Sequence, residues 1–310
     1  MARLLDRRGD GGCGLRALPA RLGGARLAAR PARARLEAVR DPEPVADLRV
    51  GTCGWSSAAW KEHFYPPHLP PAERLAFYAT RFRCVEIDTT FHRMPEPHVV
   101  RHWAEAVPDS FTFCPKAPQR ITHEGPLCDH LDGLRFFCDA VDLLGPKLGP
   151  ILLQLPPSYS PHANERDLWR FLEQLPRGFR FAMEFRDPRA HRPSVIRLLE
   201  QHRVCWVWHD QTDHAHGGRG PFTFQPVTAP FLYLRLLGDL HDAAPAPHPR
   251  PDALESWAVR VRQHLASLES VFILACDSYE GSAPDTCARI LHLLGSDLPA
   301  DPPALFPVPA

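Results

Sequence analysis

The strongest constraint on the fold is a repeating alternation of short apolar runs and longer amphipathic segments. From residue 48 onward, runs of five or six mostly apolar residues, many of them β-branched or aromatic, recur eight times. Such runs predict strands, and their alternation with helical segments is typical of βα units in a parallel sheet. The predicted strands span residues 48–53, 84–88, 111–116, 151–155, 179–184, 204–208, 231–236 and 271–276.

The amphipathic segments between these runs predict helices. In one of them, Leu134, Phe137 and Val141 recur at helical spacing, which indicates a face that packs against a core. No helical period appears between residues 210 and 230, so a loop is predicted there in place of a helix. The helices are predicted at residues 71–81, 96–106, 127–144, 163–175, 193–201, 252–268 and 284–294.

The number of βα units determines the predicted fold class. They occupy residues 48–295, close to the roughly 250 residues typical of a closed (β/α)8 barrel. We therefore predict an α/β fold, a single-domain (β/α)8 barrel of the TIM type. A doubly wound open sheet is the alternative, although no G-x-G-x-x-G motif follows the first run. Residues 1–47, rich in Arg and Ala, are predicted to be a disordered arm, and residues 296–310 an extended proline-rich tail.

Charge and cysteine content limit the binding partners and the cellular compartment that can be expected for this chain. The chain carries 36 basic and 36 acidic side chains, so a nucleic-acid role would have to rest on a local basic patch. No apolar run approaches the roughly 18 residues that span a bilayer, so no membrane partner is expected. The nine cysteines form no C-x-x-C pair, which argues against a disulfide framework and a structural zinc site. We expect a cytoplasmic protein, with organellar targeting by the arginine-rich arm as the alternative.

Nearly every predicted strand ends in a polar or charged residue. In a (β/α)8 barrel these residues meet at the C-terminal mouth, where the active sites of such enzymes lie. Strands buried on both faces are usually apolar throughout, so charges there indicate function or buried ion pairs. The strand-end residues are Thr52, Gly54, Trp55, Glu86, Asp88, Lys116, Gln154, Glu184, Arg186, His209, Asp210, Arg235 and Asp277.

Two carboxylates and a histidine are the candidate catalytic groups. Glu184 could act as general base or acid, with His123 as its partner in proton transfer, and Glu86 is the third candidate. Glu86 could instead belong to a structural ion-pair network inside the barrel, and His123 could be an ordinary surface histidine in a turn. Glu184 and Arg186 are two residues apart, so on a continuous strand they share a face and form one functional unit or one buried ion pair.

Three cations and three further side chains are the candidate substrate-binding groups. Guanidinium forks suit carboxylate or phosphate, and a lysine adds a point charge. Aromatic rings could line a pocket for a ring or sugar face, and a strand-end amide could bind the ligand. The predicted substrate-binding residues are Lys116, Arg186, Arg235, Trp55, Phe91 and Gln154.

A metal site is the least supported alternative. Carboxylates and a histidine at strand ends could hold a divalent cation. However, no H-x-H or H-E-x-x-H motif lies on a predicted strand or helix, and His214 and His216 lie in the predicted loop. We therefore assign no metal ligands and identify no cofactor. The oxygen and nitrogen ligands considered are Glu86, Asp88, Glu184, Asp210, Asp277 and His209.

Several motifs in order resemble those of the YecE-like family, known as domain of unknown function 72. They are GTCGW at 51–55, VEIDTTFHR at 85–93, KAPQRITH at 116–123, LGPILLQLPPS at 148–158 and AMEFRDP at 182–188. The resemblance implies a (β/α)8 barrel and supplies no established reaction. The mouth positions that it implies are Gly51, Gly54, Trp55, Glu86, Phe91, Lys116, Thr122, His123, Gln154, Glu184, Arg186 and Arg235.

The chain departs from the family pattern at several mouth positions. Cys53, Asp88 and His92 stand where the resemblance implies Ser, Asn and Tyr. Leu237 replaces a histidine after the seventh strand, and Cys276 begins what would be an asparagine pair after the eighth. These departures indicate that this chain does not keep the full activity of the family that it resembles.

Three functions are compatible with these observations. The first is a hydrolase or lyase acting on a small anionic substrate that bears phosphate or carboxylate. The second is a ligand-binding or regulatory protein whose catalytic activity has decayed, which Leu237 and Cys276 favour. The third is a metal-dependent phosphodiesterase or nuclease. A small anionic ligand is the expected partner.

Overall fold

A computed structural model describes residues 46–61, 63–161, 163–210, 225–238 and 249–298. All of these residues belong to one compact unit, Pro42–Ala310. Nearly all of the predicted arm, most of the predicted tail and the central part of the predicted 210–230 loop, with His214 and His216, lie outside the described residues. No helix in the described part is both long enough and apolar enough to span a bilayer.

Every predicted apolar run contains a strand, and all named strand pairs are parallel. The sixth run is divided at Val207, whose backbone N–H donates to the carbonyl of Met183 at 2.9 Å, so pairing continues across the break. The strands are β1 Asp47–Cys53, β2 Cys84–Ile87, β3 Thr112–Pro115, β4 Ile151–Gln154, β5 Phe181–Glu184, β6 Cys205–Trp206, β7 Trp208–His209, β8 Phe231–Leu236 and β9 Ser270–Ala275.

The strands close into a barrel in chain order. One sheet has the order β3-β2-β1-β9-β8-β7 and the other β4-β5-β6. Between β3 and β4, the backbone N–H of Ala117 donates to Leu152 at 2.8 Å, and that of Gly149 to Phe113 at 2.7 Å. The first strand β1 pairs with the last strand β9 along its whole length except Cys53. The prediction of a (β/α)8 barrel is therefore confirmed.

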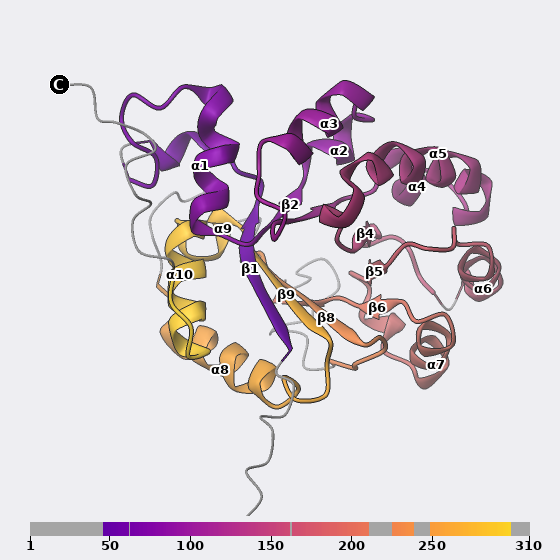
Figure 1. The fold of residues 1–310 in the computed structure, drawn as a ribbon. Coiled ribbons are helices and arrows are strands. Elements are labelled where there is room, and N and C mark those ends of the chain that lie inside the picture. Colours follow the sequence, from indigo (N-terminus) through magenta and orange to yellow (C-terminus); the bar gives the residue numbers. More distant parts are fainter. Residues whose placement is uncertain (1–45, 62, 162, 211–224, 239–248, 299–310) are drawn as a thin grey trace, which may run out of the picture. The chain divides into compact units, whose positions relative to one another are not determined.

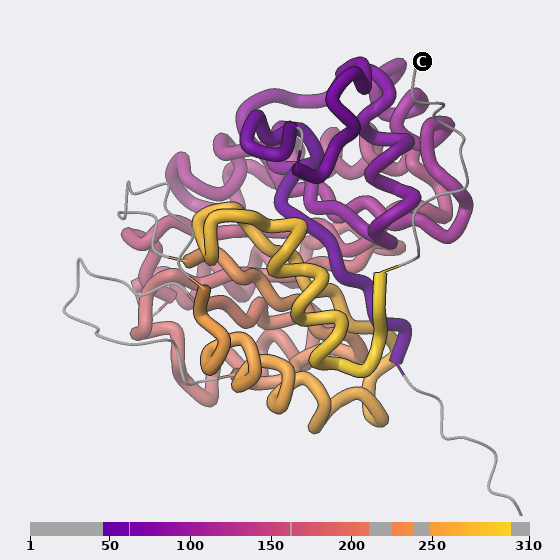
Figure 2. The backbone as a smooth tube through the Cα atoms, turned by 90° about the vertical axis from the view of Figure 1, so that its left-hand side faces the viewer, coloured from indigo at the N-terminus to yellow at the C-terminus, as the bar shows by residue number. Residues whose placement is uncertain are grey.

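Helices lie outside the strands, as in other (β/α)8 barrels (Figure 1). The helix α10 packs against β1, across the seam where the first and last strands meet (Figure 2). The helices are α1 Arg74–Arg81, α2 Thr89–His92, α3 Pro97–Glu105, α4 Gln119–His123, α5 Leu131–Val141, α6 Glu165–Glu173, α7 Pro193–Gln201, α8 Pro251–Arg262, α9 Asp277–Glu280 and α10 Ala283–Leu293. The described residues also include the 3-10 segments η1 Ala58–Trp60, η2 Pro71–Glu73, η3 Leu127–His130, η4 Asp142–Lys147 and η5 Pro188–Ala190.

Three short helices were not predicted: α2, α4 and α9. Each is four or five residues long and follows closely after the C-terminal end of a strand, close to the mouth. A single helical turn carries no hydrophobic period, so the sequence offers no signal for it. His123 accordingly ends the short helix α4, whereas a turn was expected there.

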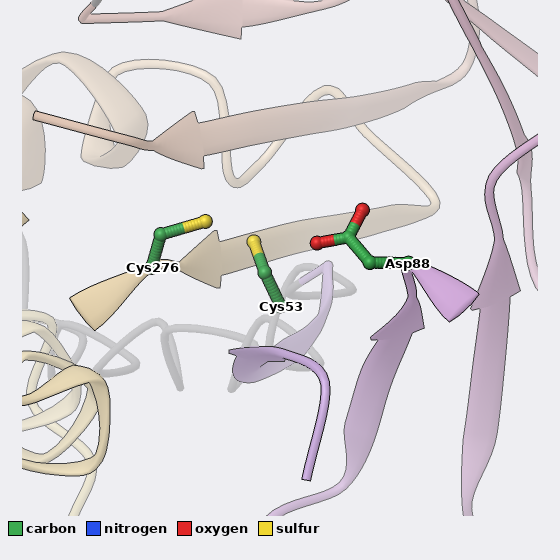
Figure 3. Close-up of side chains that lie close together, drawn as sticks. All are labelled: Cys53, Asp88 and Cys276. Carbon is green, nitrogen blue, oxygen red and sulfur yellow. The ribbon is translucent and has the colours of Figure 1, made fainter. Parts of the chain in front are cut away.

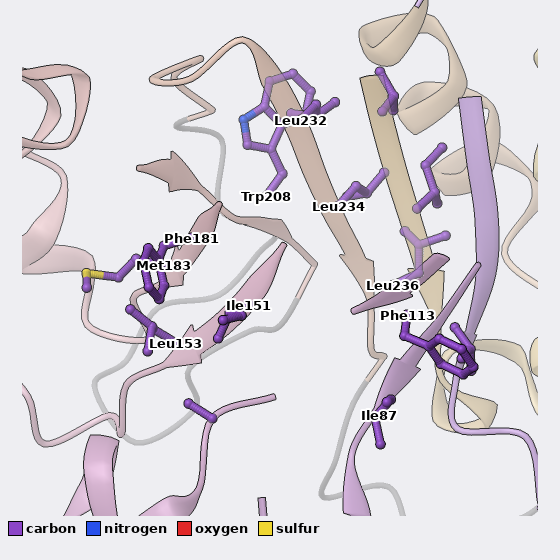
Figure 4. Packing of buried hydrophobic residues seen from close by; sticks show 14 of the residues in the cluster. Ile87, Phe113, Ile151, Leu153, Phe181, Met183, Trp208, Leu232, Leu234 and Leu236 are labelled. Carbon is purple, nitrogen blue, oxygen red and sulfur yellow. The ribbon is translucent and has the colours of Figure 1, made fainter. Parts of the chain in front are cut away.

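Strand alternation divides the apolar residues into two cores. In β8, Leu232, Leu234 and Leu236 belong to the larger core beneath the helices (Figure 4). Phe231 and Tyr233 belong to a smaller core inside the barrel. Because side chains alternate along a strand, Arg235 also points into the interior, two residues after Tyr233. The inner core includes three small buried thiols: Cys84, Cys114 and Cys205.

Gly51 provides a test of how closely β1 approaches β2. A Cβ atom at this position would lie 1.9 Å from the carbonyl oxygen of Cys84. The backbones of β1 and β2 cannot move apart without breaking the hydrogen bonds between the two strands. Gly51→Ala should therefore lower the free energy of unfolding by about 1–3 kcal/mol or more. Gly133→Ala in α5 is the control, since its Cβ would meet no atom closer than 3.8 Å and should stabilise the helix by about 0.5–1 kcal/mol. Urea unfolding of both variants measures the difference, and equal effects would contradict the packing.

Candidate functional site

Arg235 lies at the centre of the mouth and binds two buried carboxylates. Its Nη2 and Nε atoms donate to the two oxygens of Glu86 at 2.6 and 3.0 Å, and Nη1 donates to Glu184 Oε2 at 2.7 Å. Glu86 and Glu184 have no exposed surface, and Arg235 retains 2%. Buried charges require partners of this kind, because an unpaired one costs several kcal/mol.

Two further donors complete this network. The Tyr233 hydroxyl donates to Glu86 Oε2 at 2.8 Å, and Arg186 Nε forms an ion pair with Glu184 Oε1. Two carboxylates therefore face two guanidinium groups. Arg235 was predicted to clamp an anionic ligand, but its three nitrogens are instead engaged by glutamates. Tyr233 was not predicted, although its position two residues before Arg235 in β8 could have placed it on the same face.

The environment of Glu184 differs from that expected of a general base. Burial alone would raise the pKa of its carboxyl, but Arg186 and then Arg235 outweigh burial and hold the pKa well below its ordinary value. A carboxylate so strongly stabilised in its charged form accepts a proton poorly near neutral pH. Glu184 thus pairs with both arginines, with Arg186 through Oε1 and with Arg235 through Oε2.

Glu86 titrates differently from Glu184. Burial raises the pKa of Glu86 from its ordinary value of 4.5 to about 6, a rise that Arg235 limits and Asp88 reinforces. The two carboxylates share Arg235, but only Glu184 has a second guanidinium beside it. The difference in their pKa values follows from that asymmetry.

Lys116 and His123 lie against the Phe91 ring, and Arg186 acts electrostatically on the same histidine. The Lys116 Nζ atom lies 4.1 Å from the centroid of this ring, and the His123 ring packs edge-on against it at 5.2 Å. Burial lowers the pKa of His123, and Lys116 and Arg186 lower it further, so its imidazole is neutral at pH 7. Thr122 Oγ1 lies 2.8 Å from Nδ1 of His123 and fixes the ring.

The two cations keep donors available. Arg186 bonds Glu184 only through Nε, and its two terminal nitrogens make no hydrogen bond to any residue that the structure describes. Lys116 Nζ lies 3.7 Å from Asp88 Oδ1, which is an ion pair longer than a hydrogen bond. Their side chains retain 13% and 11% exposure, so both reach solvent at the mouth.

Gln154 and Trp55 are less closely tied to the mouth. Gln154 pairs in register with Glu184 and is buried, and its Nε2 donates to the carbonyl of Leu155 at 2.8 Å. Trp55 packs edge-on against Trp103 at 5.8 Å. Among the described residues no ring contact or hydrogen bond joins Trp55 to the charged groups of the mouth, so its predicted role stays a prediction.

The oxygen-rich metal site considered from the sequence is not assembled in the described part of the chain. Asp277 accepts from Trp60 Nε1 and Ser57 Oγ, both at 2.7 Å, and Asp210 accepts from the backbone N–H of Leu237 at 2.6 Å. His209 is buried, which lowers its pKa to about 4, and its Nε2 donates to the carbonyl of Phe185 at 3.0 Å. These contacts hold loops together.

Another group at the mouth could hold a metal ion. The potential ligand atoms of Cys53, Asp88 and Cys276 all lie within 4.8 Å of one another (Figure 3). Asp88 was among the ligands considered from the sequence, but the two thiols were missed because their separation along the chain matches no metal-binding motif. Two surface hollows of about 510 and 680 Å³ lie elsewhere, around α6 and α7, and include no charged residue of the mouth.

The raised pKa of Glu86 predicts a pH-dependent contribution to stability. The folded protein binds this proton more tightly than the unfolded chain, so the contribution is complete below pH 4.5 and is lost as the pH rises through about 6. The advantage of the wild type over Glu86→Gln should therefore fall by about 2 kcal/mol between those limits. Urea unfolding across this range measures it, with Asp132→Asn, at an exposed carboxylate, as control. A constant difference would mean that Glu86 stays ionised in the fold.

Comparison with known proteins places the chain in a family. The family model described as "Protein of unknown function DUF72" matches residues 49–306. The UPF0759 protein YecE of Escherichia coli K12 is 40% identical over 113 residues, which are 36% of this chain and 40% of YecE. The chain thus spans less than half the length of that relative in this match. The UPF0759 protein YunF of Bacillus subtilis is 22% identical over 271 residues, 80% of this chain and 94% of YunF.

Solved structures agree on the fold. A DUF72 family protein from Thermotoga maritima superposes with a TM-score of 0.68 at 21% identity, covering 81% of this chain and all of that one. A DUF72 family protein from Enterococcus faecalis gives a TM-score of 0.66 at 18% identity, covering 80% and 95%. The match of the family model to most of the chain, together with this shared fold, shows that the protein belongs to the DUF72 family.

Proposed function

We propose that the barrel mouth binds a small anionic substrate between Lys116 and Arg186, and that His123 transfers a proton to or from it. The reaction class that this arrangement favours is hydrolysis or elimination of a phosphate- or carboxylate-bearing compound. The observation that carries the proposal is the convergence of two cations with available donors on one neutral imidazole.

The choice of an anion follows from the donors. Arg186 offers a planar pair of terminal nitrogens that matches the two oxygens of a carboxylate or phosphate, and Lys116 adds a point charge. Glu184 holds Arg186 through Nε, which fixes the direction of its fork. The ligand would enter at the C-terminal ends of the strands, where barrel enzymes bind their substrates.

The proton-transfer role falls to His123. A neutral imidazole can accept a proton at pH 7, and burial, together with the two cations proposed to bind the substrate, keeps it neutral. Glu86 has a pKa nearer neutrality than Glu184, yet it is fully buried and faces Arg235 and Tyr233. We therefore assign Glu86 and Glu184 positioning roles, in place of the catalytic roles expected from the sequence.

Anion affinity tests the binding part of the proposal. Lys116→Met and Arg186→Met should each weaken binding of inorganic phosphate and of small carboxylates about tenfold, because each removes one charged donor. Arg135→Met is the matched control, since it removes a cation from the exposed face of α5. Calorimetric titration measures the affinities and thermal unfolding checks the fold. Wild-type affinity in both mouth variants would contradict the proposal.

The titration of His123 tests its coupling to the cations. In Lys116→Met the pKa of His123 should rise, because one of the charges that disfavour the imidazolium form is gone. The measurement is the pH dependence of the histidine ring signals in NMR spectra, with His123→Asn used to assign them. If the titration of His123 is the same in Lys116→Met and in the Arg135→Met control, then Lys116 does not act on the imidazole.

A binding protein without turnover is the second candidate. The pairing of Glu86 and Glu184 with arginines favours this candidate, because it leaves these two of the three expected acid–base groups less able to transfer protons. Saturable anion binding that His123→Asn leaves unchanged, without turnover of phosphate or carboxylate esters, would support this candidate over an enzyme.

A further inference from the structure

Two thiols and a carboxylate meet at neighbouring strand ends. Cys53 ends β1, Asp88 follows β2 and Cys276 follows β9, and these strands are adjacent in the order β2-β1-β9. Thr52 pairs with Ala275, so the register carries Cys53 opposite Cys276, at the roughly 4.8 Å spacing of paired strands. Barrel closure therefore determines that these side chains meet.

The three side chains point toward one common space (Figure 3). Their sulfur and carboxylate oxygen atoms lie within 4.8 Å of one another, and each residue is half-buried. Asp88 Oδ1 is buried but accepts no hydrogen bond within the described part of the chain. A buried carboxylate oxygen without a donor calls for a further partner.

We propose that Cys53, Cys276 and Asp88 bind a zinc ion. Two thiolates and one carboxylate oxygen suit zinc, whereas magnesium and calcium prefer oxygen ligands alone. At the usual zinc–ligand distances, the ligand atoms of a tetrahedral site lie about 3.5–3.8 Å apart, so each pair of ligand atoms, now within 4.8 Å, has to approach by at most about 1.3 Å. Three protein ligands leave the fourth position open to water or a small ligand.

The charge balance explains how a dication fits beside two cations. Asp88 Oδ1 lies 3.7 Å from Lys116 Nζ and 3.9 Å from Arg235 Nη2, and both cations would repel an added positive charge. Zinc forms two Zn–S bonds and displaces both thiol protons to solvent, so the net charge of the mouth does not change. Burial raises the pKa of the Cys53 thiol, as does its hydrogen bond with Cys276, so binding should strengthen as the pH rises.

The alternative to zinc binding is a disulfide bond between Cys53 and Cys276. An oxidant such as a low-molecular-weight disulfide could take two electrons and two protons from Cys53 and Cys276. That reaction would leave the buried Asp88 oxygen without a donor, whereas zinc uses all three groups. The zinc site does not depend on the function proposed for Lys116, Arg186 and His123, and it is tested without a substrate.

The test is zinc titration of the reduced, full-length protein against a metallochromic competitor. We expect one tightly bound zinc ion per chain and release of two protons per ion. Cobalt in its place should give the near-ultraviolet charge-transfer band of thiolate ligation. Cys53→Ser and Cys276→Ser should each weaken zinc binding by more than the roughly 10–100-fold that loss of a supporting residue typically costs. Asp88→Asn should also weaken it.

Cys128→Ser is the matched control, because it removes a half-buried thiol outside the cluster and should leave zinc affinity unchanged. Circular dichroism verifies that the serine variants fold, and the proton count and cobalt spectrum of the wild type test the site without any variant. The proposal is overturned if the wild type binds no more zinc than the Cys53→Ser/Cys276→Ser double variant. Loss of two titratable thiols to a low-molecular-weight disulfide, without zinc binding, would overturn it in favour of a redox pair.

Discussion

The ion-pair network centred on Arg235 is the interaction on which the mouth depends. Arg235 projects from β8 and reaches Glu86 on β2 and Glu184 on β5, strands that lie in different parts of the barrel wall. The interior therefore has a polar layer that joins three strands above the apolar core. Removing the arginine alone would leave two carboxylates buried without sufficient compensation, which is far more costly than never burying them.

This network also separates the roles of the charged residues. Glu184 forms ion pairs with two arginines, which keep its carboxyl group ionised. The same contact orients Arg186 toward the solvent side of the mouth. Lys116 and His123, which both contact the Phe91 ring, lie outside that inner layer. A preorganised site requires supporting residues that hold its geometry, here the inner ion-pair network, and separate groups whose donors remain available to a ligand, here the outer cations.

The sequence predicted the barrel well because its signals are local. Each strand is an apolar run. Glu184 and Arg186 were expected, on a continuous strand, to form one functional unit or one buried ion pair, and the structure shows the ion pair although β5 ends at Glu184. The use of Arg235 could not be read in this way, since which cation turns toward which carboxylate depends on the register of distant strands. Cys53 and Cys276 were invisible for the same reason, because the seam between β1 and β9 brings them together.

That seam also affects how the chain can fold. Of the strands that the structure describes, β1 is synthesised first and β9 last, yet they pair along almost the whole of β1. Until β9 has emerged, one edge of β1 has no partner within the sheet, and the hydrogen-bonding groups along it are open to other chains. The closing step thus joins the described strands at the greatest sequence separation, and we expect it to be slow and to leave partly synthesised chains prone to association.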